Sequence, residues 1–422
     1  MKIDQIVSFV SRLIYYIEEK NTSFDKAFIY TRNDLKVKRP LRLYYVIGRD
    51  VVSKYFFLRD IAREFFGRAS RKNIVRTWIV LYGENYAELR EATLRLKKKL
   101  SKRGKVVSPE ALLEELSCGE KLSVKYSVPL WIVEKLSKYM SFQELEQLFS
   151  SMAEETVWLR VNTLKISVRE AMDYLTRKHV EVELDEDYEF MLRVKESRAP
   201  VYALKYVREG KLVIQDKGSV AIVDALTLER NDYILDLCAA PGLKTSLIFQ
   251  LLENQCRVLA CDISWDRIKI MKKLLRLHGV DLSKVDVIKA DSREVFVRKG
   301  CGVTKVLVDA PCSSSGVMSK DPAIRIQLSL PNIVEKYSNL QRSLLEAALS
   351  LPEVHSIVYS TCSILPEEGE KVVDYFVSKG YKCLTRTIGS SGYRGFLCST
   401  KVKRLFPHIH GTCGFFVAGL AD

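Results

Sequence analysis

The sequence contains no apolar run of the roughly 18 residues that a membrane-spanning helix needs. Residues 1–18 are apolar only on a helical period, without the continuous apolar stretch and cleavage site of a secretory signal peptide. These absences argue against a membrane-spanning or secreted protein. We therefore expect the chain to stay in the cytoplasm and to make no contact with a membrane.

Regularly spaced cysteine pairs of the zinc-binding type are also absent, so no metal site is predicted for the ten cysteines. In a long chain without a secretory signal most of them should be reduced thiols, and some are candidates for catalysis. The G-x-G-x-x-G pattern of dinucleotide-binding proteins is missing, as is the first glycine of a phosphate-binding P-loop. The missing glycine pattern argues against a nicotinamide-dependent oxidoreductase.

The sequence is long and carries an excess of positive charge. Its 67 Lys and Arg outnumber 52 Asp and Glu, which gives a formal net charge of +15. Such a field favours a polyanion partner such as nucleic acid, although charge alone fits a basic protein without that partner equally well. The 422 residues exceed one ordinary hydrophobic core, so two or three domains are expected.

The first predicted domain, residues 1–120, is all-helical. Apolar periodicity predicts helices over residues 51–66, 74–82 and 86–103, and Pro109 follows a serine that opens another short helix. The third of these helices ends in a basic cluster, for which phosphate contact is favoured over a merely solvated helix end. The cluster comprises Lys97, Lys98, Lys99, Lys102 and Arg103.

A second predicted unit, residues 123–205, is a small α+β module. A helix over residues 131–139 opens it, and strands over residues 157–162 and 180–184 flank a helix over residues 168–177. The third unit, residues 206–422, alternates apolar strands with amphipathic helices. Its strands fall at residues 233–237, 257–262, 285–289, 306–309, 355–359 and 414–418. This alternation predicts an α/β domain with a parallel, doubly wound sheet that binds ligands at the carboxyl ends of its strands.

Residues suited to a nucleoside ligand lie at those strand ends. The turn after the first strand is built of small residues that allow close backbone approach. It comprises Cys238, Ala239, Ala240, Pro241, Gly242, Leu243 and Lys244. Acidic residues end or follow the first four strands, at Asp236, Asp262, Asp291 and Asp309. A carboxylate accepts ribose hydroxyls, and the lack of a phosphate cradle favours S-adenosylmethionine as the cofactor.

Two cysteines follow neighbouring strands, Cys312 in a Pro-Cys motif and Cys362 in a Thr-Cys motif. A lone cysteine is more often a small buried apolar residue than a nucleophile. Two cysteines at adjacent strand ends face the same crevice, and this reverses that expectation.

These residues closely resemble the RNA (cytosine-5)-methyltransferase family, the Sun or RsmB-like enzymes. The resemblance covers roughly the last 300 residues, including residues 157–162 and Gln215-Asp216. It is carried by residues 238–245, Asp262, residues 309–313, Gly316-Val317, Asp321-Pro322, residues 360–363, residues 365–368 and residues 414–416. It implies a Rossmann-like, S-adenosylmethionine-dependent domain preceded by the family's small α+β module. More faintly, the N-terminal helices resemble a NusB-like RNA-binding domain.

The resemblance also implies roles for single residues. Cys362 is the nucleophile that attacks the base, and Cys312 assists product release. The turn residues 238–244, Asp262, Asp291 and Asp309 line the cofactor site, and Arg267 also contacts it. Addition of a thiolate at carbon 6 of cytosine breaks the aromaticity and turns carbon 5 into a nucleophile. Asp309, if protonated, is a candidate hydrogen-bond donor to ring nitrogen 3.

The substrate implied is RNA, with ribosomal RNA favoured over transfer RNA because of the NusB-like region. No obligate protein partner is inferred. A non-catalytic RNA-binding or ribosome-assembly factor on the same fold is the main alternative. One departure from the family stands out, because Leu243 occupies a position that is usually a second glycine. A leucine that points into the cofactor site would weaken binding there.

Overall fold

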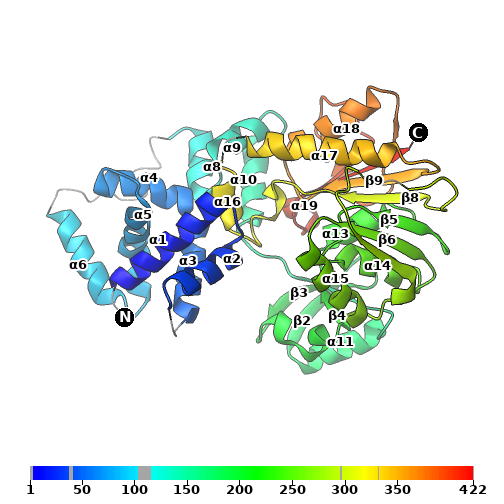
Figure 1. Ribbon diagram of the computed structural model, residues 1–422. Helices are drawn as coiled ribbons and strands as arrows, with labels where there is room; N and C mark the ends of the chain where they lie inside the picture. Colours follow the sequence, from blue (N-terminus) through cyan, green and yellow to red (C-terminus); the bar gives the residue numbers. More distant parts are fainter. Residues whose placement is uncertain (1–2, 38–40, 103–115, 295–296, 331, 422) are drawn as a thin grey trace. The chain divides into compact units, whose positions relative to one another are not determined.

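The computed structural model describes residues 3–37, 41–102, 116–294, 297–330 and 332–421. The chain divides into two compact units (Figure 1). The first unit comprises Met1–Glu154 and Val317–Ile333, and the second comprises Glu155–Gly316 and Val334–Asp422. Over the described ranges, no helix has the length and apolar character needed to cross a bilayer. The finer division into three units, with boundaries near residues 120 and 205, stays a prediction.

The first unit is helical throughout its described part. Helix α1 (Ile3–Lys20) buries Phe9, Ile14 and neighbouring apolar residues against α2, α3, α5 and α16. The remaining helices are α2 (Phe24–Asp34), α3 (Leu41–Ser53), α4 (Tyr55–Phe66), α5 (Arg71–Tyr82), α6 (Arg90–Ser101), α8 (Cys118–Tyr126), α9 (Leu130–Leu136), α10 (Phe142–Ser151) and α16 (Ala323–Gln327), with the short 3-10 turn η1 (Gly83–Asn85) before α6. Capping boxes start α8 at Ser117 and α10 at Ser141, and satisfy backbone donors of the first turn.

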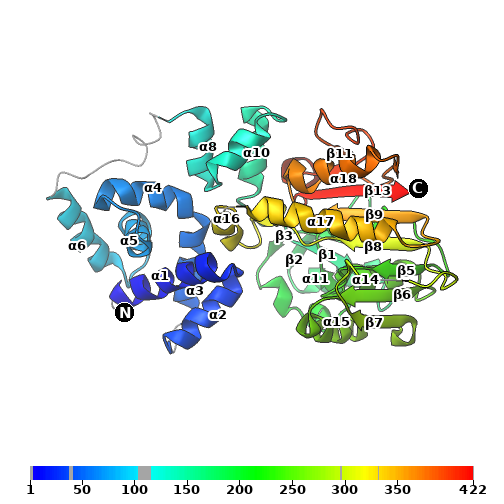
Figure 2. The ribbon, with the colours of Figure 1, turned by 45° about the horizontal axis from the view of Figure 1, so that its top comes forward.

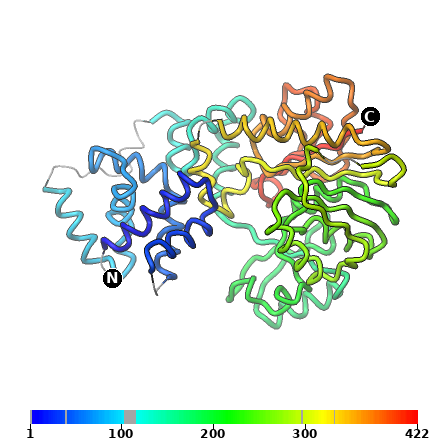
Figure 3. The backbone as a smooth tube through the Cα atoms, in the orientation of Figure 1, coloured from blue at the N-terminus to red at the C-terminus, as the bar shows by residue number. Residues whose placement is uncertain are grey.

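The prediction of one helix over residues 51–66 is wrong, because α3 ends at Ser53, α4 begins at Tyr55 and Lys54 separates them. Figure 3 follows the backbone through both helices in blue. The N–H of Phe56 donates to Ser127 Oγ at 2.8 Å instead of to a carbonyl one turn back. A side chain distant in the sequence thus competes with the helical hydrogen bond, which periodicity alone cannot reveal. The helix predicted over residues 86–103 begins only at Arg90, and the helix predicted from Pro109 lies outside the described residues.

The second unit begins with a four-stranded antiparallel sheet in the order β2-β3-β1-β4. Its strands are β1 (Trp158–Val161), β2 (Val180–Leu184), β3 (Met191–Ser197) and β4 (Leu212–Ile214). Helix α11 (Val168–Arg177) packs on β2, and the short turns η2 (Val201–Ala203) and α12 (Lys205–Arg208) lead into β4. The strands and helix predicted over residues 157–184 are therefore present.

A nine-stranded sheet follows, with the order β11-β12-β13-β9-β8-β5-β6-β7 and with β10 paired to β13. Strands β5 (Tyr233–Asp236), β6 (Arg257–Asp262), β7 (Val285–Lys289), β8 (Lys305–Asp309) and β9 (Ser356–Thr361) run parallel. Strand β13 (Phe415–Ala421) runs antiparallel beside β9, and β10 (Lys382–Cys383), β11 (Ser390–Ser391) and β12 (Lys403–Leu405) complete the sheet. The predicted doubly wound α/β sheet is confirmed.

Helices cover both faces of this sheet (Figures 1 and 2). One face carries α13 (Lys217–Asp224), α14 (Leu243–Leu251) and α15 (Trp265–Leu277), and the other carries α17 (Ile333–Leu349) and α18 (Glu370–Val377). The short elements are η3 (Leu282–Lys284), η4 (Ser315–Val317), η5 (Pro366–Glu368) and α19 (Pro407–His410). The chain runs from β5 outward to β6 and β7 and then returns to β8 on the other side of β5. Loops after β5 and β8 therefore diverge and open a crevice at their carboxyl ends.

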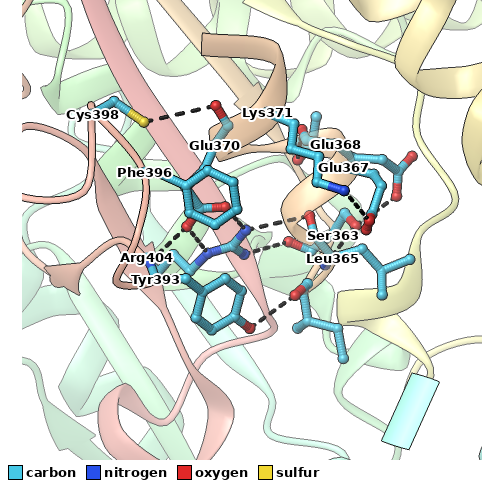
Figure 4. A network of polar contacts seen from close by, with 12 residues as sticks. Ser363, Leu365, Glu367, Glu368, Glu370, Lys371, Tyr393, Phe396, Cys398 and Arg404 are labelled. Carbon is cyan, nitrogen blue, oxygen red and sulfur yellow. Dashed lines mark hydrogen bonds and ion pairs between the residues drawn. The ribbon is translucent and has the colours of Figure 1, made fainter. Parts of the chain in front are cut away.

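A buried ion pair joins two distant parts of this unit (Figure 4). Arg404 on β12 and Glu370 at the start of α18 are both fully buried, with Nη2–Oε2 at 2.5 Å and Nε–Oε1 at 2.7 Å. The same guanidinium donates to the carbonyl oxygens of Ser363 at 3.0 Å and Leu365 at 3.3 Å. Because the guanidinium binds two carbonyl oxygens of the turn that follows β9, the pair fixes that turn.

Replacing Arg404 with methionine should strongly destabilise the protein, because Glu370 would remain buried without a counter-ion. We expect a loss of about 3–5 kcal/mol in the free energy of unfolding. Urea denaturation followed by circular dichroism measures it. Arg257→Met is the matched control, because Arg257 forms an exposed pair with Asp286 at 3.3 Å and should contribute little. Equal effects of the two substitutions would contradict the argument.

Candidate functional site

A cavity of about 490 Å³ lies at the carboxyl ends of the parallel strands. This volume is typical of sites for small molecules and cofactors. The end of β6, the loops after β5, β6, β7 and β8, and the first turn of α15 contribute Leu237, Cys238, Asp262, Ile263, Arg267, Asp291, Ser292, Arg293 and Pro311. Helix α17 supplies the opposite wall with Lys336, Tyr337, Asn339, Leu340, Ser343 and Leu344.

Asp262 is the best-anchored acidic residue of this cavity. Its carboxylate is 3% exposed and accepts hydrogen bonds from the backbone N–H groups of Ala240 at 3.2 Å and Ser264 at 2.9 Å. Arg267 pairs with the same carboxylate at 3.2 Å and also donates to the carbonyl oxygen of Ala240. The turn after β5 and the end of β6 are thereby locked to each other, and Arg267, a predicted cofactor contact, is one of the residues that line the cavity.

The small-residue turn contributes mainly its backbone. Of the seven residues of this turn that were predicted to contact the cofactor, Cys238 lines the cavity, whereas Ala239, Ala240, Pro241, Gly242, Leu243 and Lys244 do not. Gly242 has a φ of +97°, and a Cβ there would lie 2.6 Å from Met271 Cγ, so a glycine is required. Leu243 is the first residue of α14 and does not obstruct the cavity.

The four strand-end acids have different surroundings. Asp262 and Asp291 line the cavity, and Asp236 and Asp309 do not. Asp236 is 1% exposed, accepts the Thr245 hydroxyl at 2.8 Å, and has its pKa raised by burial to about 7. Asp291 receives the Arg293 guanidinium at 2.5 Å, and hydrogen bonds from Arg293 lower its pKa to about 2.

Asp309 pairs with Lys244, whose Nζ lies 2.5 Å from Asp309 Oδ2, and accepts the Ser360 hydroxyl on Oδ1 at 2.8 Å. Burial lowers the pKa of Lys244, but the charge and hydrogen bond of Asp309, together with the nearby Cys362 and Asp236, raise the pKa overall. Each oxygen of the Asp309 carboxylate thus accepts one hydrogen bond. The predicted role of Asp309 as a proton donor would require this pair to separate.

The side chains of the two predicted catalytic cysteines lie in contact with each other. The sulfur atoms of Cys312 and Cys362 are 3.1 Å apart, and Ser314 Oγ lies 3.6 Å from Cys362 Sγ. The hydrogen bond from Cys312 lowers the pKa of Cys362, against the opposing effect of burial, and raises the pKa of Cys312 well above its ordinary value. Cys362 is therefore the thiol that ionises first, which suits a nucleophile.

The loops that carry the two thiols are interlocked. The N–H of Gly316 donates to the carbonyl oxygen of Cys362 at 2.9 Å, and the N–H of Gly414 donates to that of Gly316 at 2.8 Å. A Cβ on Gly316 would collide with the Gly414 carbonyl group, so only glycine fits. The buried carboxylate of Glu368 accepts hydrogen bonds from both Ser313 and Ser363.

Sequence reasoning missed the α17 wall and the contacts of Glu368. Lys336, Tyr337 and Asn339 carry no motif, and only the fold brings them to the cavity. Glu368 stood inside the Leu-Pro-Glu-Glu motif without an assigned role. Its position six residues after Cys362, in a segment already tied to the thiol, was the available signal.

The sheet order, the cavity at the strand ends and the paired thiols define the class of Rossmann-like methyltransferases. The model of the 16S rRNA methyltransferase RsmB/F family matches residues 223–421, and the RsmF/B-like ferredoxin-like domain matches residues 128–201. The chain belongs to the RsmB/F methyltransferase family.

Two curated relatives illustrate the similarity. Ribosomal RNA small subunit methyltransferase B of Klebsiella pneumoniae is 31% identical over 315 residues, which cover 74% of this chain and 69% of that protein. The human 28S rRNA (cytosine(4447)-C(5))-methyltransferase is 34% identical over 315 residues, which cover 70% of this chain and 38% of that protein. The chain thus spans about two fifths of the length of the mouse and human relatives it matches.

Solved structures share the fold. The crystal structure of PH0851 aligns with a TM-score of 0.76 at 25% identity, over 100% of this chain and 99% of that chain. A methyltransferase homologue from Pyrococcus horikoshii aligns with a TM-score of 0.62 at 24% identity, over 73% of this chain and 100% of that chain.

Alkylation of Cys362 by iodoacetamide should have a lower pH midpoint than alkylation of an ordinary thiol, because the hydrogen bond from Cys312 lowers the pKa of Cys362. A lowered pKa means that the thiolate persists as the pH falls. Cys312→Ala removes the hydrogen bond that contributes most and should move the midpoint upward. Mass spectrometry of peptides measures each site, with the exposed Cys301 as an internal reference. An unchanged midpoint in the variant would refute this cause.

Proposed function

We propose that this protein is an S-adenosylmethionine-dependent RNA methyltransferase that forms 5-methylcytosine through a covalent bond to Cys362. The observation that carries the proposal is the 3.1 Å approach of the Cys312 and Cys362 sulfur atoms on adjacent loops of a methyltransferase fold. Methylation at carbon 5 needs a nucleophile and then a group that assists release, and the two thiols supply both.

The cavity residues fit the cofactor. Asp262 ends β6 with a buried carboxylate, the position from which a ribose is held in this architecture. Leu237, Leu340 and Leu344 offer apolar surface for an adenine ring, and Asp291 and Ser292 offer polar groups at its edge. When bound, the cofactor supplies an electrophilic methyl group.

Catalysis begins at Cys362. Its thiolate adds to carbon 6 of the cytosine, which forms a carbon–sulfur bond and moves electron density to carbon 5. Carbon 5 then takes the methyl group. A base then takes the proton from carbon 5, the sulfur of Cys362 leaves carbon 6 as a thiolate, and the aromatic ring is restored. Cys312, 3.1 Å from the nucleophile, assists this release.

Charged groups beside the thiols support these steps. The positive charge of Lys244 contributes to the lowered pKa of Cys362. Asp309 holds Lys244 in place through the 2.5 Å ion pair, and the Ser360 hydroxyl in turn donates to Asp309 at 2.8 Å. Asp309 remains a candidate for hydrogen bonding to the base once its pair with Lys244 has opened.

The substrate proposed is unpaired RNA, because a base inside a helix cannot reach the thiols without being unstacked. Ribosomal RNA is favoured over transfer RNA, since the relatives from bacteria, yeast and animals are named for ribosomal RNA. The RNA contact of the N-terminal helices and the cytoplasmic location stay predictions. Bisulfite sequencing of RNA from cells with and without the gene would identify the target.

Substitution of the two cysteines should give opposite phenotypes. Cys362→Ala should abolish both methylation and the covalent complex with RNA. Cys312→Ala should instead trap the protein on its RNA in a complex that resists denaturation, because the adduct forms but is not released. Denaturing gel electrophoresis with labelled RNA separates the two cases. Exchanged phenotypes would show that Cys312 is the nucleophile, and a fully active Cys362→Ala protein would end the proposal.

Cofactor binding can be tested without RNA. S-adenosylhomocysteine at 100 times its Kd should stabilise the protein by about 2.7 kcal/mol in a melting experiment, and NAD should not. Asp262→Ala should weaken the binding by about 10- to 100-fold, because a charge-assisted hydrogen bond contributes roughly 1.5–3 kcal/mol. Asp286→Ala, which removes an exposed carboxylate on β7, is the control. Equal affinities of both variants would exclude Asp262 from the site.

A further inference from the structure

Glu368 is a fully buried carboxylate that touches the residues next to both catalytic thiols. It ends η5, six residues after Cys362 (Figure 4). Its Oε1 accepts the N–H of Ser313 at 2.7 Å, and its Oε2 accepts the hydroxyl groups of Ser363, at 2.6 Å, and of Ser313. Because Ser313 follows Cys312 and Ser363 follows Cys362, one carboxylate joins the two loops beside their sulfur atoms.

Glu368 is itself held by the sheet through its backbone and by α17 through its carboxylate. The backbone carbonyl oxygen of Glu368 accepts the Tyr359 hydroxyl at 2.7 Å and the Thr361 hydroxyl at 3.2 Å, both from β9. Gln341 of α17 donates to Glu368 Oε1 at 3.1 Å and to the carbonyl oxygen of Pro311 at 2.9 Å. These contacts leave Glu368 little freedom to shift.

Glu368 is held by neutral donors alone, since none of the described residues forms an ion pair with it. A buried carboxylate without a cation is costly to the fold, and burial raises its pKa. An apolar residue would avoid that cost but would leave the two serine hydroxyl groups without their shared acceptor. A role of the Glu368 carboxylate in setting the geometry of the two cysteine loops would explain why this burial cost is tolerated.

We propose that Glu368 is a positioning residue that fixes the distance between the Cys312 and Cys362 sulfur atoms. It makes no contact with the reacting atoms and acts through Ser313 and Ser363. The proposal rests on the proposed function, in which both thiols must reach one cytosine in succession. Cys312 can assist release only if its loop stays close to the base while Cys362 is bonded to it.

Phenylarsine oxide measures the thiol spacing without any RNA or cofactor. Its arsenic atom bonds to the sulfur atoms of two thiols, and the two thiol protons leave with its oxygen as water, so it bridges only thiols that lie close together. The native protein should carry an arsenic bridge between Cys312 and Cys362, located by mass spectrometry of its peptides, and Cys312→Ala should not. In Glu368→Gln the affinity of this bridge should fall at least tenfold.

Glu367→Gln is the matched control. Glu367 is the preceding residue, and its carboxylate pairs with Lys371 at 2.8 Å (Figure 4). Its substitution should leave the arsenic affinity within twofold of the native value. Equal affinities in Glu368→Gln and the native protein, or equal losses in both glutamine variants, would overturn the proposal. If Glu368→Gln does not fold, Ser313→Ala with Ser363→Ala tests the same link, and unchanged arsenic binding in that double variant overturns it.

A kinetic readout distinguishes positioning from general damage. In Glu368→Gln the covalent complex with RNA should form at close to the native rate, and its release should slow at least tenfold, with the KM for RNA within twofold. A structural defect would slow both steps and raise the KM, and that result would count against positioning. If the native protein methylates no RNA, the proposed function fails, while the arsenic measurement still decides the role of Glu368.

Discussion

The active arrangement depends on the register in which β8 pairs with β9. These parallel strands place Asp309 opposite Ser360, so the chain leaves both strands at the same level of the sheet. Cys312 follows three residues after Asp309 and Cys362 two residues after Ser360, and the sulfur atoms meet at 3.1 Å. A shift of one residue along either strand would turn these side chains to opposite faces and separate the thiols.

Buried polar groups hold the loops after β8 and β9 in place beyond the ends of the paired strands. Glu368 contacts both cysteine loops, and Arg404, paired with Glu370, binds the carbonyl oxygen of Ser363 in the turn after Cys362. Such groups are costly to desolvate. They allow few alternative arrangements of the loops, because each buried polar group must keep its hydrogen-bond partners. The site is thus supported by specific polar contacts, whereas the apolar core around Leu235, Val306 and Tyr359 supplies the bulk of the burial.

Much of this could be predicted from the sequence, for physical reasons that differ between elements. The parallel strands are short apolar runs between amphipathic helices, and β6, β7 and α11 have the predicted bounds. Cys312 and Cys362 could be placed together because each follows a strand of the same sheet. The break at Lys54 could not be predicted, because it depends on Ser127, more than seventy residues away. The α17 wall of the cavity was also missed, since a helix facing a ligand has the same amphipathic pattern as one facing the core.

The division of the chain has a consequence for how the protein is made. Residues Val317–Ile333 belong to the helical unit, where Ala323 and Ile326 join its core and Asp321 accepts the N–H of Phe24 at 3.2 Å. The ribosome therefore synthesises Cys312 before it completes the first unit, although that unit starts at the N-terminus. The N-terminal helices must wait for a segment from the middle of the catalytic region, and a truncation at the boundary near residue 154 would deprive both parts of native contacts.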